Sequence, residues 1–143
     1  MRLSTDCLTE LLGFHVRMAS AAIARDFNAA MAEFGLTQKQ FAVLRLIQEN
    51  SGVSQVDLAA VLETDRATMM ALVDRLEKRS LIERQPSTRD RRRIELHLLE
   101  AGEALLFAAK KVLETHEQRL HGRLSEGEAS ELVRMLKQLY SET

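Results

Sequence analysis

The spacing of apolar residues along the chain changes several times, and each change marks a predicted element. From about residue 8 to residue 34 apolar positions recur every three or four residues, which is typical of one long amphipathic helix. This stripe consists of Leu12, Val16, Ala19, Ile23, Phe27, Ala30 and Phe34. A second, mostly apolar row on the same helix consists of Leu8, Leu11, His15, Met18 and Ala22. Two such rows indicate that the helix faces its own core on one side and a partner subunit on the other.

Three shorter helices are predicted next. Thr37 with Gln40, and Ser54 with Asp57, have the spacing of capping boxes that start helices. The first of these helices carries its buried face on Phe41, Leu44 and Ile47. The second has apolar residues at Val56, Leu58, Ala59 and Leu62, and the third at Met69, Leu72, Val73 and Leu76. Only residues 63–65 separate the last two helices, which is a helix-turn-helix arrangement.

A β-hairpin and two further helices complete the pattern. Residues 81–84 and 93–98 alternate apolar and polar side chains around a polar, turn-rich segment, 85–92. Residues 101–122 are then helical by periodicity, and Ser125 with Glu128 forms a third capping box before a last helix to Tyr140. The predicted fold is mainly α with a small β-hairpin wing: a winged helix-turn-helix flanked by N- and C-terminal helices.

Composition is consistent with this fold. The 143 residues, of which 45% are hydrophobic, suit one domain with its own core over 1–143. We expect a winged-helix lobe over about 36–98, flanked by helical segments over about 8–34 and 100–141. No apolar run is long enough to cross a bilayer and the N-terminus lacks a signal-peptide pattern, so we expect the protein in the cytoplasm. The single cysteine, Cys7, excludes a disulfide within the chain.

Charge is unevenly distributed although the net charge is only −1. Five arginines and one acid lie between Arg84 and Arg93, and the rest of the chain is acidic overall. An acidic body with one basic edge would repel DNA except where that edge faces it. The basic hairpin directly after a helix-turn-helix therefore indicates double-stranded DNA as the partner.

Each part of this unit suits a different groove of DNA. Small or polar residues in the first turns of the second helix allow it to approach base edges in the major groove, and arginines suit the narrow, negative minor groove. The candidate DNA-binding residues are Ser54, Gln55, Arg66, Ala67, Thr68, Met70, Ala71, Arg75, Arg89, Asp90, Arg91 and Arg92. We expect Asp90 to hold one neighbouring arginine by a forked, charge-assisted pair and so to shape the loop.

The residues that carry these features resemble the MarR family of winged-helix transcriptional regulators. The matching positions are 36–38, 40–41, 43–44, 58–59, Thr68, 72–79, 81–82, Arg84, the Asp90-Arg91-Arg92 signature and Ala101-Gly102. The resemblance runs nearly end to end. It implies a homodimer joined through its N- and C-terminal helices, which binds a pseudo-palindromic operator, usually represses, and is released by a small ligand, often an aromatic acid.

The sequence departs from the family pattern at three places. Ser80 replaces a glycine at a helix end that needs positive φ or a different turn, and Leu99 replaces a threonine that would cap the following helix. Met70 and Ala71 occupy recognition-helix positions that are more often polar or basic. The first two concern stability, whereas the third concerns which bases are read.

A ligand site is less sharply indicated. Aromatic and other residues that would line a cavity between the dimer helices and the DNA-binding lobe are Phe14, His15, Met18, Phe41 and Phe107. Arg17 or Arg45 would pair with a ligand carboxylate. Ordinary core packing explains the apolar members of this set equally well.

Other functions find less support in the sequence. A cysteine-based redox sensor would need Cys7 activated, but no cation is obviously placed to lower its pKa. No two of the four histidines have the spacing of a helical zinc pair, so no metal and no other cofactor is expected. No catalytic motif is present, so an enzyme is not expected. The competing class is a winged helix used only for protein interaction.

Overall fold

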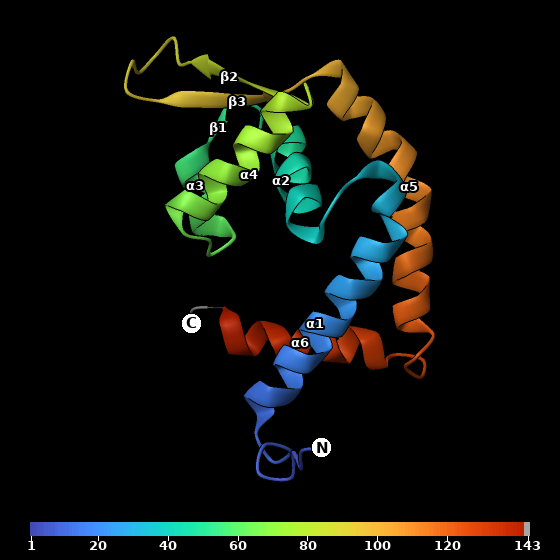
Figure 1. The fold of residues 1–143 in the computed structure, drawn as a ribbon. Helices are drawn as coiled ribbons and strands as arrows, with labels where there is room; N and C mark the ends of the chain where they lie inside the picture. Colours follow the sequence, from blue (N-terminus) through green and yellow to red (C-terminus); the bar gives the residue numbers. More distant parts are fainter. Residues whose placement is uncertain (142–143) are drawn as a thin grey trace. The chain divides into compact units, whose positions relative to one another are not determined.

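The computed structural model describes residues 1–141; residues 142–143 of the expected domain lie outside it. Its described part is mainly helical with one small sheet, which confirms the predicted fold class (Figure 1). The elements are α1 (Leu12–Ala30), the 3₁₀ turn η1 (Ala32–Phe34), α2 (Gln38–Glu49), β1 (Val53–Ser54), α3 (Gln55–Val61), α4 (Arg66–Lys78), β2 (Ile82–Pro86), β3 (Ile94–Leu98), α5 (Glu100–His121) and α6 (Glu128–Tyr140). None of the helices within 1–141 is long and apolar enough to span a membrane.

The chain divides into two compact units, which we describe separately. One contains Met1–Ala30 and the chain from Lys111 onward, and the other is Met31–Lys110. The second unit contains the helix-turn-helix α3–α4, with β2 and β3 as the wing (Figure 1). Its core is formed by side chains that are at most 1% exposed: Met31, Val43, Leu44, Ile47, Leu58, Met69, Val73, Leu76, Ile82, Leu96 and Ala109. Phe41, expected on the buried face of α2, is only half-buried, whereas Val43, which is not among the residues predicted for that face, is fully buried.

Capping side chains set the helix starts in this unit. Thr37 and Gln40 form the expected capping box at α2, and Ser54 and Asp57 form the one at α3. Each box satisfies backbone N–H groups that have no partner within the helix. The α5 helix begins at Glu100, directly after Leu99, whose aliphatic side chain offers no acceptor for a helix N–H. The backbone N–H of Leu99 itself donates to Leu81 O at 2.9 Å.

The sheet contains one strand more than the predicted hairpin. Its order is β1-β3-β2 and both pairings are antiparallel, with Ile82 opposite Leu98 and Val53 opposite Leu96. The two residues of β1 are too short for an alternating pattern to be visible in the sequence. Their pairing with β3 anchors the start of α3 to the wing, since β1 ends at Ser54 and α3 begins at Gln55.

In the other unit, α1 is shorter than predicted. It begins at Leu12 rather than near Leu8, because the preceding backbone forms three-residue turns, with the Leu8 N–H donating to Thr5 O and the Leu11 N–H to Leu8 O, in place of helical hydrogen bonds. It ends at Ala30, before the buried Met31 and the η1 turn, and Gly35 at φ +61° closes that turn. Helix α1 buries only Phe27.

The predicted capping box before α6 forms only in part. The Ser125 N–H donates to a Glu128 carboxylate oxygen at 2.5 Å, and the Ser125 hydroxyl contacts the same oxygen. The N-cap residue is however Gly127, at φ +82°, and no side chain caps the helix. The helix starts later than expected because the Ser125 hydroxyl is bound to the carboxylate rather than to a helix N–H.

Candidate DNA-binding surface

Helix α4 presents a continuous exposed face beginning at its first residue. Its N-cap, Asp65, accepts the Thr68 N–H at 2.7 Å and the Thr68 hydroxyl at 2.8 Å. These hydrogen bonds hold the pKa of the Asp65 carboxyl below its usual range. The opposite face buries Met69, Leu72, Val73 and Leu76, as predicted. The exposed residues of α4 are Arg66, Ala67, Thr68, Met70, Ala71, Arg75 and Lys78.

The start of α3 is less accessible than the sequence suggested. Ser54 is 8% exposed, and its hydroxyl accepts the Asp57 N–H at 3.1 Å. Gln55 is half-buried, and its Oε1 accepts a hydrogen bond from Arg84 at 3.2 Å. Both side chains are therefore engaged in holding the unit together.

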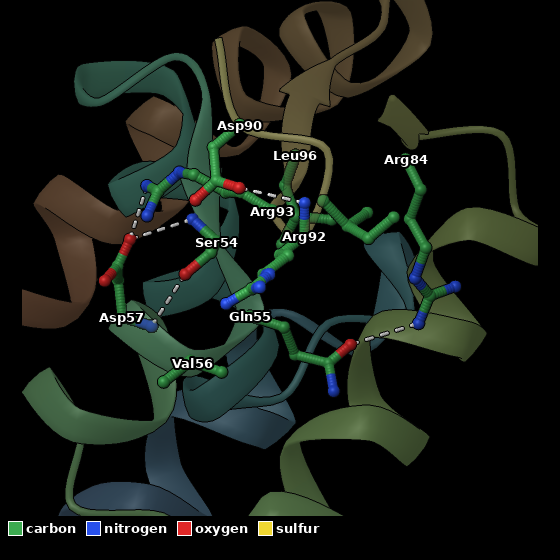
Figure 2. Close-up of a pocket in the computed structure, with 10 residues that line it drawn as sticks. Ser54, Gln55, Val56, Asp57, Arg84, Asp90, Arg92, Arg93 and Leu96 are labelled. Atoms are coloured by element: carbon green, nitrogen blue, oxygen red, sulfur yellow. Dashed lines mark hydrogen bonds and ion pairs between the residues drawn. The ribbon is translucent and has the colours of Figure 1, made fainter. Parts of the chain in front are cut away.

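The wing loop is shaped by Asp90, but not through the expected pair. Its Oδ1 accepts the backbone N–H of Arg92 at 3.0 Å, and its carbonyl accepts the Arg93 N–H at 3.0 Å (Figure 2). Within the described chain no arginine side chain forms an ion pair with Asp90, so the predicted forked pair is wrong. A short aspartate side chain reaches a backbone N–H two residues on with little loss of side-chain freedom, whereas an arginine must order a long side chain.

The five arginines of this region fall into two groups. Arg84 on β2 contacts Asp74 and Glu77 of α4, both at 2.7 Å, and Arg93 contacts Asp57 of α3 at 2.7 Å. Inside the range 1–141 the other three arginine side chains, Arg89, Arg91 and Arg92, have no hydrogen-bond or ion-pair partner. The local positive charge inferred from the sequence is therefore partly neutralised, and what remains is concentrated at the loop.

An open groove of about 430 Å³ lies between this loop and the start of α3 (Figure 2). Its apolar lining includes Val56, Ile94 and Leu96, and its polar lining includes Arg92 and the Asp57–Arg93 pair. Val56, expected among the apolar residues of α3, is 59% exposed and faces this groove. The sequence did not reveal the groove, because it depends on pairing across the sheet.

The structure does not gather the five candidate ligand residues within either unit. Phe14, His15 and Met18 lie on α1, whereas Phe41 on α2 and Phe107 on α5 belong to the second unit. The His15 ring lies edge-on to Phe14 with centroids 5.5 Å apart, and Phe107 is 82% exposed. None of the five lines the groove beside the wing.

Cys7 and His116 differ in their exposure to solvent. Cys7 is a free, exposed thiol, whereas His116 is almost fully buried against Asp26. Within residues 1–141 no three His, Cys, Asp or Glu side chains cluster in a way that would hold a metal ion.

Known proteins match this chain over nearly its whole length. The MarR family profile matches residues 36–94. The putative transcriptional regulatory protein for the hcr operon of Thauera aromatica is 35% identical over 130 residues, which cover 90% of this chain and 78% of that protein.

Solved structures agree with the sequence match. The transcriptional repressor CouR bound to a 23-mer DNA duplex is 36% identical, with a TM-score of 0.89 over 97% of this chain and 99% of that one. CouR bound to p-coumaroyl-CoA is 35% identical, with a TM-score of 0.91 over 99% of this chain and 100% of that one. Together with the exposed helix face and the arginine-rich wing, these similarities show that the chain belongs to the MarR family of transcriptional regulators.

Proposed function

We propose that this regulator is a homodimeric repressor that binds a pseudo-palindromic operator and is released by a small aromatic ligand. The observation that carries the proposal is the exposed face of α4 beside three unpaired wing arginines, within one compact unit. The repressor CouR, of the same fold, has been solved on DNA and with an aromatic acyl-CoA. We propose a cytoplasmic, non-enzymatic role, in keeping with relatives that are transcriptional regulators.

Each part of the surface has a proposed contact. Arg66, Ala67, Thr68, Met70, Ala71 and Arg75 would enter or flank the major groove. Small side chains let the helix approach base edges, and the arginines reach phosphate or guanine. Arg89, Arg91 and Arg92 would lie along the flanking minor groove, with Asp90 keeping their loop in shape. Ser54 and Gln55 would position the helices from within, because both are largely occupied by partners in the protein.

Homodimerisation is supported by apolar side chains that a lone chain leaves exposed. Within the described residues α6 buries none of its side chains, and the N-terminal half of α1 is equally uncovered. The exposed apolar residues are Leu11, Leu12, Val16, Met18, Leu132, Val133, Met135, Leu139 and Tyr140. Apolar patches of this kind on two helices are characteristic of subunit interfaces. A dimer would set two copies of α4 about one DNA turn apart.

The proposed ligand acts by shifting a population of dimer geometries. It releases DNA only to the extent that it prefers the geometry that does not fit the operator. An aromatic acid, free or as a thioester, would suit the candidate set Phe14, His15, Met18, Phe41 and Phe107. A redox alternative would instead use the exposed Cys7, and peroxide would then release the parent protein but not a Cys7→Ser variant from DNA.

The test uses a duplex selected in vitro from random sequence by the full-length protein. We expect binding to weaken steeply as salt rises, and Arg91→Ala combined with Arg92→Ala to lower affinity without altering the dimer measured by light scattering. Arg2→Ala with Arg123→Ala removes two exposed arginines outside this unit and is the matched control. Failure to select any duplex at low salt would support the protein-interaction class instead. Unchanged affinity in the wing variant would refute the wing assignment.

A further inference from the structure

Arg93 connects the base of the wing to the start of the helix-turn-helix. It directly precedes β3, and its guanidinium contacts Asp57 (Figure 2). Its Nη2 lies 2.7 Å from Asp57 Oδ2 and 3.3 Å from the carbonyl oxygen of Gly52. The two charged residues are 36 positions apart in the sequence. The contact therefore joins the wing to the segment that leads into α3.

Asp57, in the first turn of α3, is itself held in place by the N-cap residue Ser54. Its Oδ2 also accepts the Ser54 N–H at 3.0 Å, while its own N–H donates to the Ser54 hydroxyl. These hydrogen bonds, followed by the one from Arg93, hold the pKa of the Asp57 carboxyl below its usual range, so it is ionised at neutral pH. A carboxylate with fixed neighbours makes a rigid anchor for a guanidinium.

Arg84 forms a second tie on the neighbouring strand. Its guanidinium contacts Asp74 and Glu77 of α4 and Gln55 of α3, and its backbone N–H donates to Glu77. The wing is thus attached at its base to both helices of the helix-turn-helix. Beyond these ties, the loop that carries Arg89, Arg91 and Arg92 is held by hydrogen bonds among its own residues, such as that from the Ser87 N–H to the Arg93 carbonyl.

We propose that Arg93 is a positioning residue for operator binding: paired with Asp57, it fixes the wing against α3 and sets where Arg91 and Arg92 meet DNA. It does not itself neutralise a phosphate, because its guanidinium would first have to leave the anchored carboxylate. This inference rests on the proposed function. It gives Arg93 a different role from Arg91 and Arg92, although the three are adjacent in the sequence.

Salt dependence separates the two roles. Each phosphate contact releases counterions, so losing one reduces the slope of log affinity against log salt by about 1. Loss of a positioning contact weakens binding but leaves that slope nearly unchanged. We expect Arg93→Gln to weaken binding about fivefold at an unchanged slope, whereas Arg91→Gln lowers both affinity and slope.

Asp57→Asn should change operator affinity in opposite directions depending on whether Arg93 is a positioning residue or a phosphate contact. Asparagine can still accept the Ser54 N–H but no longer anchors a guanidinium by charge. If Arg93 is a positioning residue, this variant weakens binding, and the double variant Asp57→Asn with Arg93→Gln is no weaker than either single one. If Arg93 is a phosphate contact restrained by Asp57, the same variant strengthens binding and steepens the salt slope, which would overturn the inference.

Circular dichroism and amide hydrogen exchange of the free protein distinguish a mobile wing from a misfolded variant. Arg93→Gln should keep the parent circular dichroism spectrum while amide hydrogens of residues 87–92 exchange faster, and Arg91→Gln should leave that exchange unchanged. Unchanged exchange in Arg93→Gln would overturn the proposal. If the parent protein binds no selected duplex, the proposed function has failed; if it binds and Arg93→Gln lowers the slope by about 1, only this inference has failed.

Discussion

His116 Nδ1 lies 2.6 Å from Asp26 Oδ2, although the two residues are 90 positions apart in the chain. The imidazole is 1% exposed and meets the Phe27 ring edge-on, with centroids 5.3 Å apart. Arg119 Nη2 contacts the same carboxylate oxygen at 3.2 Å. A buried polar group with a charged partner and an aromatic neighbour holds α1 and the part of α5 from Lys111 onward together.

Removing this imidazole should destabilise the protein. We expect His116→Ala to lower the free energy of unfolding by about 2 kcal/mol, because it leaves a cavity beside Phe27 and strips Asp26 of one partner. Urea unfolding at fixed protomer concentration measures the change. His121→Ala, on the exposed part of the same helix, is the control and should stay within about 0.5 kcal/mol of the parent. Equal effects of the two variants would contradict a structural role for His116.

The same contact makes stability depend on acid pH. Hydrogen bonds from His116 and then from Arg119 lower the pKa of Asp26 below its usual range. The unfolded chain therefore binds more protons than the folded one below about pH 4, and the stabilisation present above that pH is lost as pH falls. We expect the free energy of unfolding to decrease less between pH 5 and pH 3 in Asp26→Asn than in the parent, measured by urea unfolding at each pH. Identical pH profiles would show that the contact contributes nothing.

Gly102 is required where α5 passes close to the sheet. A Cβ atom at this position would lie 2.3 Å from the Leu81 carbonyl oxygen and 2.7 Å from Leu98 Cδ1. We therefore expect Gly102→Ala to cost about 3 kcal/mol despite the helix preference of alanine, as thermal or urea unfolding would measure. Gly13→Ala on α1, where nothing lies within 4 Å, should be neutral or slightly stabilising. A Gly102→Ala protein as stable as the parent would mean that the helix shifts without cost.

Ser80 adopts the left-handed conformation that glycine favours. Its φ is +57°, so the departure from the family pattern keeps the turn and carries backbone strain. Ser80→Gly should raise the free energy of unfolding by about 1 kcal/mol. The control Ser20→Gly places the same change inside α1, where it should destabilise by about 0.5 kcal/mol. Destabilisation by both substitutions would argue against strain at Ser80.

Met70 should influence which DNA is preferred rather than how strongly DNA is held. It is 53% exposed on the outward face of α4. We expect Met70→Ala to select a different base at one position of each half-site, with a change of about 1 kcal/mol for that base pair. Arg91→Ala should weaken binding to all duplexes alike. Selection of the same sequence by Met70→Ala and by the parent would exclude this role.

The helix-turn-helix and its wing were predictable because their signals are local. In a capping box such as Thr37 with Gln40, two residues only three positions apart pair with backbone N–H groups at the helix start. The apolar spacing of α4 likewise indicates its buried face from neighbouring residues alone. The same locality explains the errors at the chain ends. The start of α1 depends on the backbone turns before Leu12, and the cap of α6 depends on which group the Ser125 hydroxyl contacts. Apolar spacing reports neither of these.

The sequence by itself determined the order of the helices and of the wing hairpin, the exposed face of α4 and the basic character of the wing, since periodicity and composition act within a few residues. Only the tertiary structure decided which arginines are free. Arg84 and Arg93 are chemically identical to Arg91, but the fold brings Arg84 to Asp74 and Glu77, which are 10 and 7 positions away, and Arg93 to Asp57, which is 36 positions away. Electrostatic pairing depends on distance in space, and that distance is set by the fold.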